Sequence, residues 1–387
     1  MDTIPPLSAS ERRDDLQDEL RGLRDTVRRF VRAELVPNEA RWAEQQHVDR
    51  AAWQKAGALG LLLADVPEAY GGAGGGFEHQ AAVVEECAES DSAGGFLVHS
   101  IVAHYLLNQG TEQQRRAYLP RLASGEMIGA IAMTEPGTGS DLQSIRTRAV
   151  RDGNSLLLNG SKTFISNGSM ADLVIVVART GEQEGGKGIS LVLLETRGAE
   201  GFRVGQVLEK IGQKSQDTSE LFFDDVRVPA DAVLGGEPGR GFAQLMTELP
   251  YERVLIGLTA VVAIERAVRL TVAYVREREA FGRKLMEFQN TRFVLAEAKT
   301  NAVVARSFID RCVLDVALGR IDASTASMAK WWTTELQGKV IDACLQLFGG
   351  YGYMAEYPIA RMYADARVQR IYGGTTEIMK ELIARSL

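Results

Sequence analysis

Apolar residues recur at three- and four-residue steps through the first third of the chain, and this spacing predicts amphipathic helices. Pro37 ends the first helical run. A glycine-rich break follows at 69–77, where five glycines occupy six consecutive positions. The helical stretches predicted in this third lie around residues 16–31, 53–62, 81–90, 98–107 and 112–122.

The pattern changes at Ile128. Short runs of β-branched and apolar residues now alternate with glycine-containing turns, which is typical of an all-β domain built from hairpins. The predicted strands lie in the segments IGAIAMT, SLLLNG, DLVIVVART, ISLVLLE and SELFFDDVRVP.

Helical spacing returns after Gly241. The runs at 254–278, 288–318 and 323–347 are long enough for bundle helices, and a break at 349–358 precedes a last helix at 375–384. The predicted fold is therefore multi-domain α+β. It comprises an N-terminal helical domain (1–127), a middle β-barrel or β-sandwich domain (128–240) and a C-terminal four-helix bundle (241–387).

Composition narrows the class of protein. The 387 residues carry a formal net charge of −7, which argues against a nucleic-acid binder. The three cysteines and four histidines form no metal-ligand spacing, so no metal is expected. The N-terminus lacks the pattern of a secretory signal, and no apolar run approaches the length of a membrane span. We therefore expect a cytoplasmic protein.

Common nucleotide and hydrolase motifs are absent. The chain contains no GxGxxG and no GxSxG. The segment GEQEGGKG (181–188) approaches a P-loop, but Gly188 stands where a magnesium-binding hydroxyl is needed. A solvated loop is the simpler interpretation of that segment.

Four longer motifs are more specific. They are AMTEPGTGSDLQSIRTRAV (132–150), GSKTFISNGSMADLVIVVART (160–180), YVREREAFGRKLMEFQ (274–289) and LQLFGGYGYMAEYPIARMYADARVQRIYGGTTEIMKELIAR (345–385). In this order and at these spacings they resemble the acyl-CoA dehydrogenase family, over about residues 12–385. The order helical, β, helical also matches the fold of that family.

The resemblance implies FAD-dependent chemistry. Enzymes of this family remove a proton and a hydride from adjacent carbons of a fatty acyl thioester, which gives a trans-2-enoyl-CoA. A carboxylate removes the proton beside the carbonyl and the flavin accepts the hydride. The developing enolate charge on the carbonyl oxygen needs hydrogen-bond donors.

The chain departs from the family pattern at the base. Many members carry Glu directly after the Ile-Tyr of the last motif, where this chain has Gly373. In the long-chain and isovaleryl branches the base lies in the first long C-terminal helix, a position that corresponds to Glu252. Pro250 suits a helix start and would put Glu252 in the first turn. An acidic residue favoured by the helix dipole is the plainer interpretation of that position. With Gly373 in place of the usual base, we predict Glu252 as the base, while the backbone N–H of Gly373 still faces the thioester oxygen.

The remaining site residues follow from the resemblance by position. Thr134 resembles the hydroxyl donor near flavin N5, and Arg278 supplies positive charge for the pyrophosphate of a neighbouring subunit's FAD. The alternative interpretation of Phe164 and Ile165 is that they are ordinary core residues and do not contact the flavin. The predicted cofactor-binding residues are Ile131, Met133, Thr134, Gly139, Ser140, Phe164, Ile165, Ser166, Arg278, Phe281, Gln289, Gln346, Leu347, Phe348, Gly349, Gly350, Thr375, Thr376 and Glu377. The predicted substrate-binding residues are Ser140, Pro250, Tyr251, Arg253, Gly373 and Gly374.

The segments ELPYERVLI, QDTSELFFDDVRVPADAVLG and IYGGTTEIMKELIAR read like the long-chain branch, so the expected substrate is a medium- to long-chain or branched acyl-CoA. The resemblance further implies a homotetramer (a dimer of dimers) that passes electrons to electron transfer flavoprotein. The alternatives are an isovaleryl or short-branched-chain enzyme, an acyl-CoA oxidase or monooxygenase of the same fold, and a non-catalytic relative.

Overall fold

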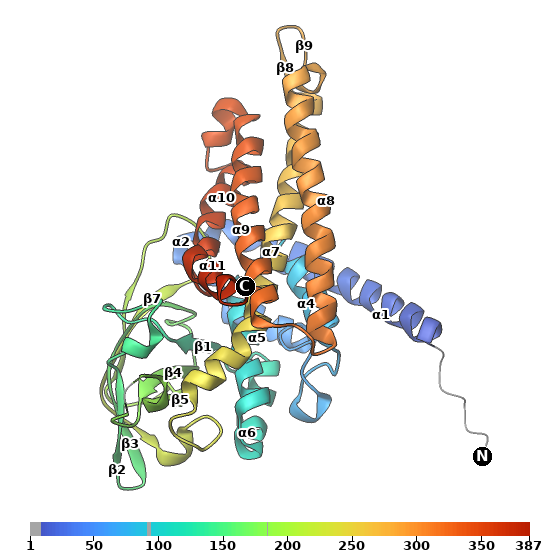
Figure 1. Cartoon of the computed structure of the whole chain (residues 1–387). Helices are drawn as coiled ribbons and strands as arrows, with labels where there is room; N and C mark the ends of the chain where they lie inside the picture. The colour runs from blue at the N-terminus through green and yellow to red at the C-terminus, as the bar shows by residue number, and fades with distance from the viewer. Residues whose placement is uncertain (1–8, 91–93, 184) are drawn as a thin grey trace, which may run out of the picture.

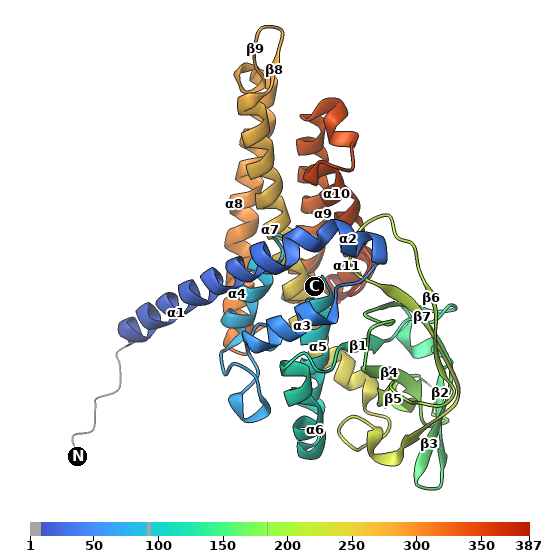
Figure 2. The ribbon, with the colours of Figure 1, turned by 180° about the vertical axis from the view of Figure 1, so that it is seen from behind.

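A computed structural model describes residues 9–90, 94–183 and 185–387. Figures 1 and 2 show the helices of the first third between two other regions: a curled β-sheet on one side and a tall bundle of C-terminal helices. The fold thus follows the predicted order of helical, β and helical parts.

The first region is helical. Its α5 is apolar on nearly every side and is enclosed by α6, strand β1 and helix α7, so it forms the centre of the molecule. Helix α6 begins at a capping box, in which the Thr111 hydroxyl accepts from the Gln114 N–H and the Gln114 side chain accepts from the Thr111 N–H. The α-helices are α1 (Ala9–Phe30), α2 (Glu39–Gln45), α3 (Arg50–Ala58), α4 (Phe77–Cys87), α5 (Gly94–Gln109) and α6 (Glu112–Ala123).

Within the described residues the middle region forms one seven-stranded curled sheet. Its strands run in the order β1-β4-β2-β3-β7-β6, with β5 paired to β4. Most neighbours are antiparallel, but β4 is parallel to both β1 and β2. The strands are β1 (Gly129–Ala132), β2 (Arg148–Asp152), β3 (Ser155–Ser166), β4 (Leu173–Arg179), β5 (Ile189–Glu195), β6 (Phe202–Val207) and β7 (Thr218–Pro229).

Strand β4 is buried on both faces, which explains its unbroken apolar sequence. Ile175 and Val177 pack into the core shared with the helices, whereas Val174 and Val176 pack inside the curl of the sheet. Because successive side chains of a strand point to opposite faces, one strand joins two cores. The helices and the sheet are therefore held in a fixed relation, and the cavity described below lies where they meet.

A buried ion pair ties β1 to β3. The Lys162 ammonium lies 2.9 Å from Glu135 Oε1 and donates to the Met133 carbonyl at 2.9 Å. Glu135 also accepts from the backbone N–H groups of Arg146 and Thr147. Burial lowers the pKa of Lys162 to about 8, although the charge of Glu135 opposes this shift. The pair fixes the chain directly after β1 against β3.

The C-terminal region has three long helices, with the shorter α10 and α11 packed against α9. A small hairpin of β8 (Glu279–Ala280) and β9 (Arg283–Lys284) lies at its tip (Figure 1). The α-helices are α7 (Gly241–Glu277), α8 (Gln289–Ala317), α9 (Ala323–Gln346), α10 (Pro358–Ala366) and α11 (Thr376–Ala384).

The expected helix start at Pro250 is wrong. Helix α7 begins at Gly241, and Pro250 lies inside it. Leu245 and Leu249 continue the buried face ahead of the proline, so their burial outweighs the one backbone hydrogen bond that a proline removes. Glu252 is consequently in the interior of a long helix rather than in its first turn.

We predict that Lys162→Met lowers the free energy of unfolding by about 3–5 kcal/mol, because it leaves the Glu135 charge buried without its partner. Lys55→Met is the matched control, since Lys55 pairs with Glu34 at 2.6 Å at the surface and should cost about 1 kcal/mol or less. Urea unfolding of both variants measures the difference. Equal losses in the two variants would contradict the structural role given to the buried pair.

Candidate active site

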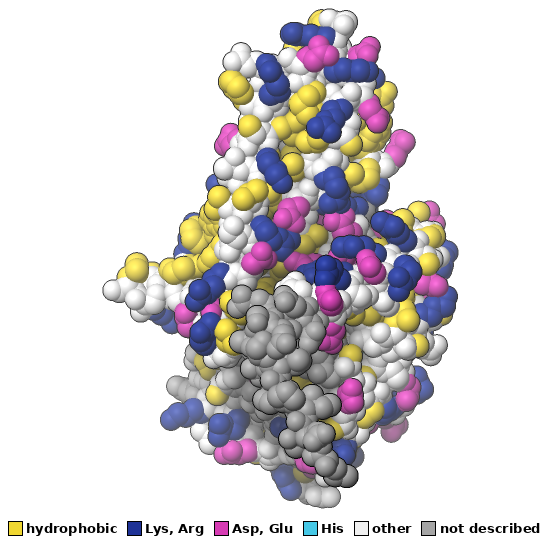
Figure 3. All heavy atoms as spheres, turned by 90° about the vertical axis from the view of Figure 1, so that its right-hand side faces the viewer, with side chains coloured by type: hydrophobic (Ala, Val, Ile, Leu, Met, Phe, Trp, Pro, Cys, Tyr) yellow, Lys and Arg dark blue, Asp and Glu magenta, His cyan; other side chains and the backbone are white. Residues whose placement is uncertain are grey.

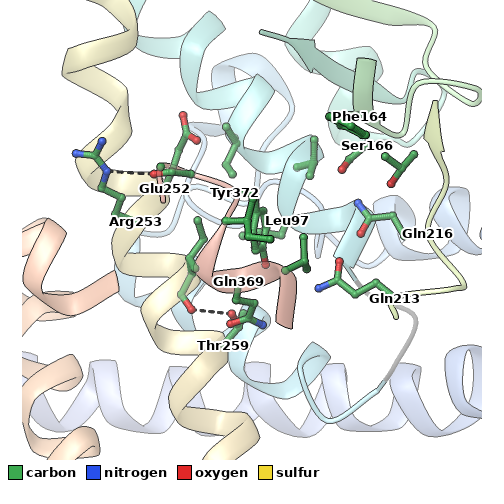
Figure 4. Close-up of a pocket in the computed structure, with 18 of the residues that line it drawn as sticks. Leu97, Phe164, Ser166, Gln213, Gln216, Glu252, Arg253, Thr259, Gln369 and Tyr372 are labelled. Atoms are coloured by element: carbon green, nitrogen blue, oxygen red, sulfur yellow. Dashed lines mark hydrogen bonds between the residues drawn. The ribbon is translucent and has the colours of Figure 1, made fainter. Parts of the chain in front are cut away.

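A cavity of about 990 Å³ lies where helices α4, α5 and α7 meet the sheet and the segment leading into α11. Figure 4 shows Glu252 and Arg253 on α7 at one side and Phe164 and Ser166 on the strand side, with Tyr372 and Gln369 between them. Its volume is at the upper end of the range for small-molecule sites. Most of the predicted site residues border this one cavity.

Glu252 brings a carboxyl group to the cavity wall from inside α7, and only 6% of the residue is exposed. Its Oε1 accepts a hydrogen bond of 2.9 Å from the Tyr105 hydroxyl on α5. Burial raises the pKa of Glu252 to about 7, because the charged form loses its hydration; the Tyr105 hydrogen bond and the charge of Arg253 oppose this shift. A carboxyl group with this pKa can accept a proton at neutral pH and release it again.

Two cations hold the glycine loop beside Glu252. The Arg253 guanidinium donates from Nε to the Gly373 carbonyl at 3.4 Å, and the Lys330 ammonium of α9 donates to the Gly374 carbonyl at 2.5 Å. Both glycines have positive φ, 66° and 101°. A Cβ on Gly373 would lie 2.6 Å from Cδ1 of Ile256. The loop therefore has a fixed conformation that strongly favours glycine.

The strand side of the cavity contains a strained aromatic residue. In the pairing of β3 with β7, Lys162 faces Leu221 and Ile165 faces Ser219, so β3 carries one extra residue and forms a bulge. Phe164 lies in this bulge with φ of 60°, and 66% of it is exposed at the cavity wall. A non-glycine residue in this conformation at a cavity is a functional candidate. An exposed aromatic ring is suited to stack on a flat ligand such as an isoalloxazine, which would cover the apolar face that water now contacts.

The structure brings the following predicted residues to the cavity wall: Ile131, Met133, Thr134, Gly139, Ser140, Phe164, Ile165, Ser166, Glu252, Arg253, Gly373, Gly374 and Thr375. Ile165 is itself only 2% exposed and packs in the core of the sheet, which agrees with the alternative interpretation that it is a core residue. Phe164 does not pack in that core.

A second set of predicted residues lies outside this cavity. Arg278 ends α7 at the bundle tip, with its guanidinium over the Tyr351 ring at 5.4 Å, and Phe348 stacks on Tyr274 with ring centroids 4.2 Å apart. Phe281, in the β8–β9 hairpin, is 96% exposed. The other members at this end of the bundle are Gln289, Gln346, Leu347, Gly349 and Gly350.

Four more predicted residues also lie off the cavity wall. Pro250 and Tyr251 belong to α7, and the Tyr251 hydroxyl donates to Asp65 at 3.2 Å. Thr376 and Glu377 form the first turn of α11, where the Thr376 hydroxyl donates to Glu335 at 2.9 Å. Within this chain none of these four residues borders the cavity.

Several residues near the site were missed from the sequence, above all Tyr105, Lys330 and Ile256. Each lies in an ordinary helical pattern and becomes significant only through a partner distant in the chain. Among residues 9–90, 94–183 and 185–387 there is no cluster of three potential metal-ligating side chains. No helix of the described chain has the length and hydropathy to cross a membrane.

Comparison with known proteins decides the family. The models of the N-terminal, middle and C-terminal acyl-CoA dehydrogenase domains match residues 17–126, 130–226 and 239–387. The chain belongs to the acyl-CoA dehydrogenase family. It is therefore an oxidoreductase that acts on CH–CH groups, and it has the fold of that family.

Relatives within the acyl-CoA dehydrogenase family include the mitochondrial long-chain specific acyl-CoA dehydrogenase of Sus scrofa, 51% identical over 94% of this chain and 85% of the relative. An acyl-CoA dehydrogenase structure from Geobacillus kaustophilus superposes with a TM-score of 0.92 at 43% identity, covering 95% of this chain and 97% of the other. A glutaryl-CoA dehydrogenase of Mycobacterium smegmatis, solved in complex with FADH2, superposes with a TM-score of 0.88 at 29% identity, covering 95% and 94%.

The raised pKa of Glu252 predicts a pH-dependent cost of burying its charge. Between pH 4.5, its ordinary pKa, and pH 7, the folded protein holds a proton that the unfolded chain has lost, so the free energy of unfolding falls as the pH rises. Above pH 7 this cost is fully present and amounts to about 3 kcal/mol. Glu252→Gln has no such cost and should be more stable than the wild type at pH 8 but nearly equal at pH 5.

Urea unfolding at equal flavin content measures this difference. Glu44→Gln, at an exposed position of α2, is the control and should show no comparable trend with pH. A gain in Glu252→Gln of the same size at pH 5 and pH 8 would show that the pKa of Glu252 is not raised.

Proposed function

We propose that this chain oxidises a medium- to long-chain or branched fatty acyl-CoA to the trans-2-enoyl-CoA, with Glu252 as the base that removes the proton beside the thioester carbonyl. The observation that carries this proposal is the buried Glu252 carboxyl at a cavity whose opposite side presents Phe164 and Ser166. The family resemblance puts the base of many members at the position of Gly373. Glycine supplies no carboxylate, so in this chain the base has to come from another element.

We propose FAD as the cofactor. Phe164, Ser166, Thr134 and the loop at Gly139–Ser140 border the cavity and would hold the flavin, since they supply an exposed ring, hydroxyl groups and backbone N–H groups. The glutaryl-CoA dehydrogenase relative, solved with FADH2, supports this assignment. Bound there, FAD would supply the acceptor for the hydride that leaves the carbon next to the deprotonated one.

The protein's own part of the reaction is proton removal and charge stabilisation. Glu252 takes the proton in surroundings that exclude water, where its carboxylate is a stronger base than in solution. We propose that the backbone N–H of Gly373 donates to the thioester oxygen as negative charge develops there. Arg253 and Lys330 hold the carbonyls of Gly373 and Gly374, so the loop does not need to reorganise during the reaction.

The shape of the cavity supports a long acyl chain. Beyond Glu252, helix α7 borders the cavity with Ile256, Thr259 and Ala263, which share one face of the helix, and with Arg253 and Arg266. From Glu252 to Ala263 this face extends roughly 16 Å at 1.5 Å per residue. Apolar residues of α4, including Val83 and Val84, border the same cavity. The long-chain specific relative from Sus scrofa agrees with this choice of substrate.

We propose further that the chain assembles as a homotetramer and delivers electrons to electron transfer flavoprotein. The bundle exposes large apolar side chains, and Figure 3 shows hydrophobic groups between charged ones over its upper part. They include Phe281, Phe293, Val303, Val304 and Tyr353. Burial of this surface against a second copy would bring Arg278 and its neighbours at the bundle tip to another subunit, as their predicted role requires.

Glu252→Gln should bind flavin normally but lose turnover by at least about 10³-fold, because the amide cannot accept the proton. Gly373→Glu in that variant should restore more activity when Ile256 is also shortened, since the new Cβ would lie 2.6 Å from Cδ1 of Ile256, although the positive φ at this position strains any side chain there. The comparison is therefore Glu252→Gln/Gly373→Glu with and without Ile256→Ala. Undiminished turnover in Glu252→Gln alone would show that the base is another group.

Anaerobic titration with CoA thioesters of increasing length tests the substrate. The longer thioesters should bleach the flavin of the wild-type protein, and Ala263→Leu should slow this reduction about tenfold or more for the longest chains, because added methylene groups fill the channel. Butyryl-CoA serves as the internal control and should be unaffected. Reoxidation by air that is as fast as transfer to electron transfer flavoprotein would favour an acyl-CoA oxidase, and a flavin that no thioester bleaches would favour a non-catalytic protein.

A further inference from the structure

We propose that Tyr105 is a positioning residue for the base: its hydroxyl holds Oε1 of Glu252, so that Oε2 is the oxygen that receives the proton. This inference depends on the proposed function, in which Glu252 is the base. It concerns a residue of α5 that does not border the cavity and that the sequence alone does not single out.

The Tyr105–Glu252 contact is fully inside the protein. Tyr105 has no exposed surface, and its hydroxyl lies 2.9 Å from Oε1 of Glu252. Within the part of the chain that the structure describes, Oε2 of Glu252 accepts no hydrogen bond, although Glu252 borders the cavity. One carboxylate oxygen is thus occupied by a donor from behind, and the other remains for the substrate.

The same face of α5 holds a second carboxylate of α7. Glu248, one turn before Glu252, accepts from Asn108 at 3.0 Å and from Gln109 at 2.7 Å. Tyr105, Asn108 and Gln109 are spaced three and four residues apart, so they share one face of their helix. Side-chain donors of α5 are therefore paired with carboxylate acceptors of α7 over one full helical turn.

His104 completes the network. Its Nε2 lies 3.0 Å from Asp65 and its Nδ1 lies 3.7 Å from Glu248, and its ring stacks on Tyr251 with centroids 3.7 Å apart. Although burial acts against it, the nearby carboxylates of Asp65 and Glu248 raise the pKa of His104 to about 9, so it is a cation at neutral pH. The positive charge of His104 therefore offsets the negative charges of Asp65 and Glu248.

The groups that act on Glu252 come from both packed helices. From α7 these are Glu248, whose charge raises the pKa of Glu252, and Arg253, whose charge lowers it. From α5 these are Tyr105 and His104, which both lower it. Tyr105 is the only one of the four that contacts the carboxylate through a hydrogen bond.

Tyr105 does not itself take the proton. Burial, and next the charge of Glu252, raise the pKa of Tyr105 well above its ordinary value, so the phenol keeps its own hydrogen throughout. In the proton step the C–H bond beside the thioester carbonyl breaks and its proton moves to Oε2 of Glu252. The electron pair of that bond, held in the enolate, forms the new C=C bond as the next carbon loses its hydride, for which bound FAD would be the acceptor. The Tyr105 hydrogen bond weakens as the carboxylate becomes neutral, so it opposes the effect of burial and lowers the pH at which Glu252 is ionised.

The pH profile of kcat in the flavin-loaded enzyme tests the proposal. In Tyr105→Phe the donor to the charged carboxylate is lost, so the acid limb should shift to higher pH by about one to two units. The plateau should fall roughly tenfold because the carboxylate is less well oriented, while KM changes less than about twofold. Site-specific 3-fluorotyrosine at position 105 is a stronger donor of nearly equal shape and should shift the limb to lower pH.

Tyr70→Phe is the matched control, because it also removes a tyrosine–glutamate hydrogen bond, that of Tyr70 to Glu112 at 2.7 Å, but at the surface. It should leave the profile unchanged. An acid limb at the wild-type pH in both Tyr105 variants, together with inactive Glu252→Gln, would overturn the role of Tyr105 and leave Glu252 as the base. Full activity in Glu252→Gln would instead overturn the proposed function, and the role of Tyr105 with it.

Discussion

The burial of one carboxyl group, that of Glu252, is the constraint on which the site depends. A base strong enough to take a weakly acidic proton must be kept from water, and charge in a dry interior is costly unless donors compensate it. The protein meets both requirements by packing α5 against α7, so that Tyr105 reaches Glu252 and Asn108 and Gln109 reach Glu248. The helix pair at the centre of the fold is thus also the support of the site.

The opposite side of the cavity is held by different means. There the buried pair of Lys162 and Glu135 and the bulge of β3 fix Phe164 in a conformation that it would not adopt in a free chain. A flat cofactor between this wall and α7 would meet surfaces that are already in place. A dehydrogenation benefits when both walls of the cavity are rigid. The group that accepts the proton and the group that accepts the hydride must lie next to adjacent carbons at the same time.

Much of this arrangement could be predicted from the sequence, because helices and strands leave periodic patterns and because the family resemblance directed attention to Gly373 and Glu252. The predicted start of α7 at Pro250 was wrong, because a proline inside a helix looks like a helix start unless the burial of the preceding turn is known. Tyr105 and Lys330 could not be found, because a polar residue in a mostly apolar helix gains its meaning only from a partner brought close by folding. Arg278 and Phe281 lie at the bundle tip, away from the cavity of the same chain, so the cofactor-binding role predicted for them would require a second copy.

The predicted base, Glu252, and the glycine loop at Gly373 are coupled through this geometry. Arg253, next to Glu252, donates to the carbonyl of Gly373, so α7 and the glycine loop meet at the same end of the cavity. Ile256, one turn after Glu252, fills the space into which a side chain at position 373 would extend. A side chain at position 373 would displace the end of Ile256 and would also have to adopt a positive φ. Position 373 is therefore constrained both by its own backbone conformation and by residue 256 of the helix that carries Glu252.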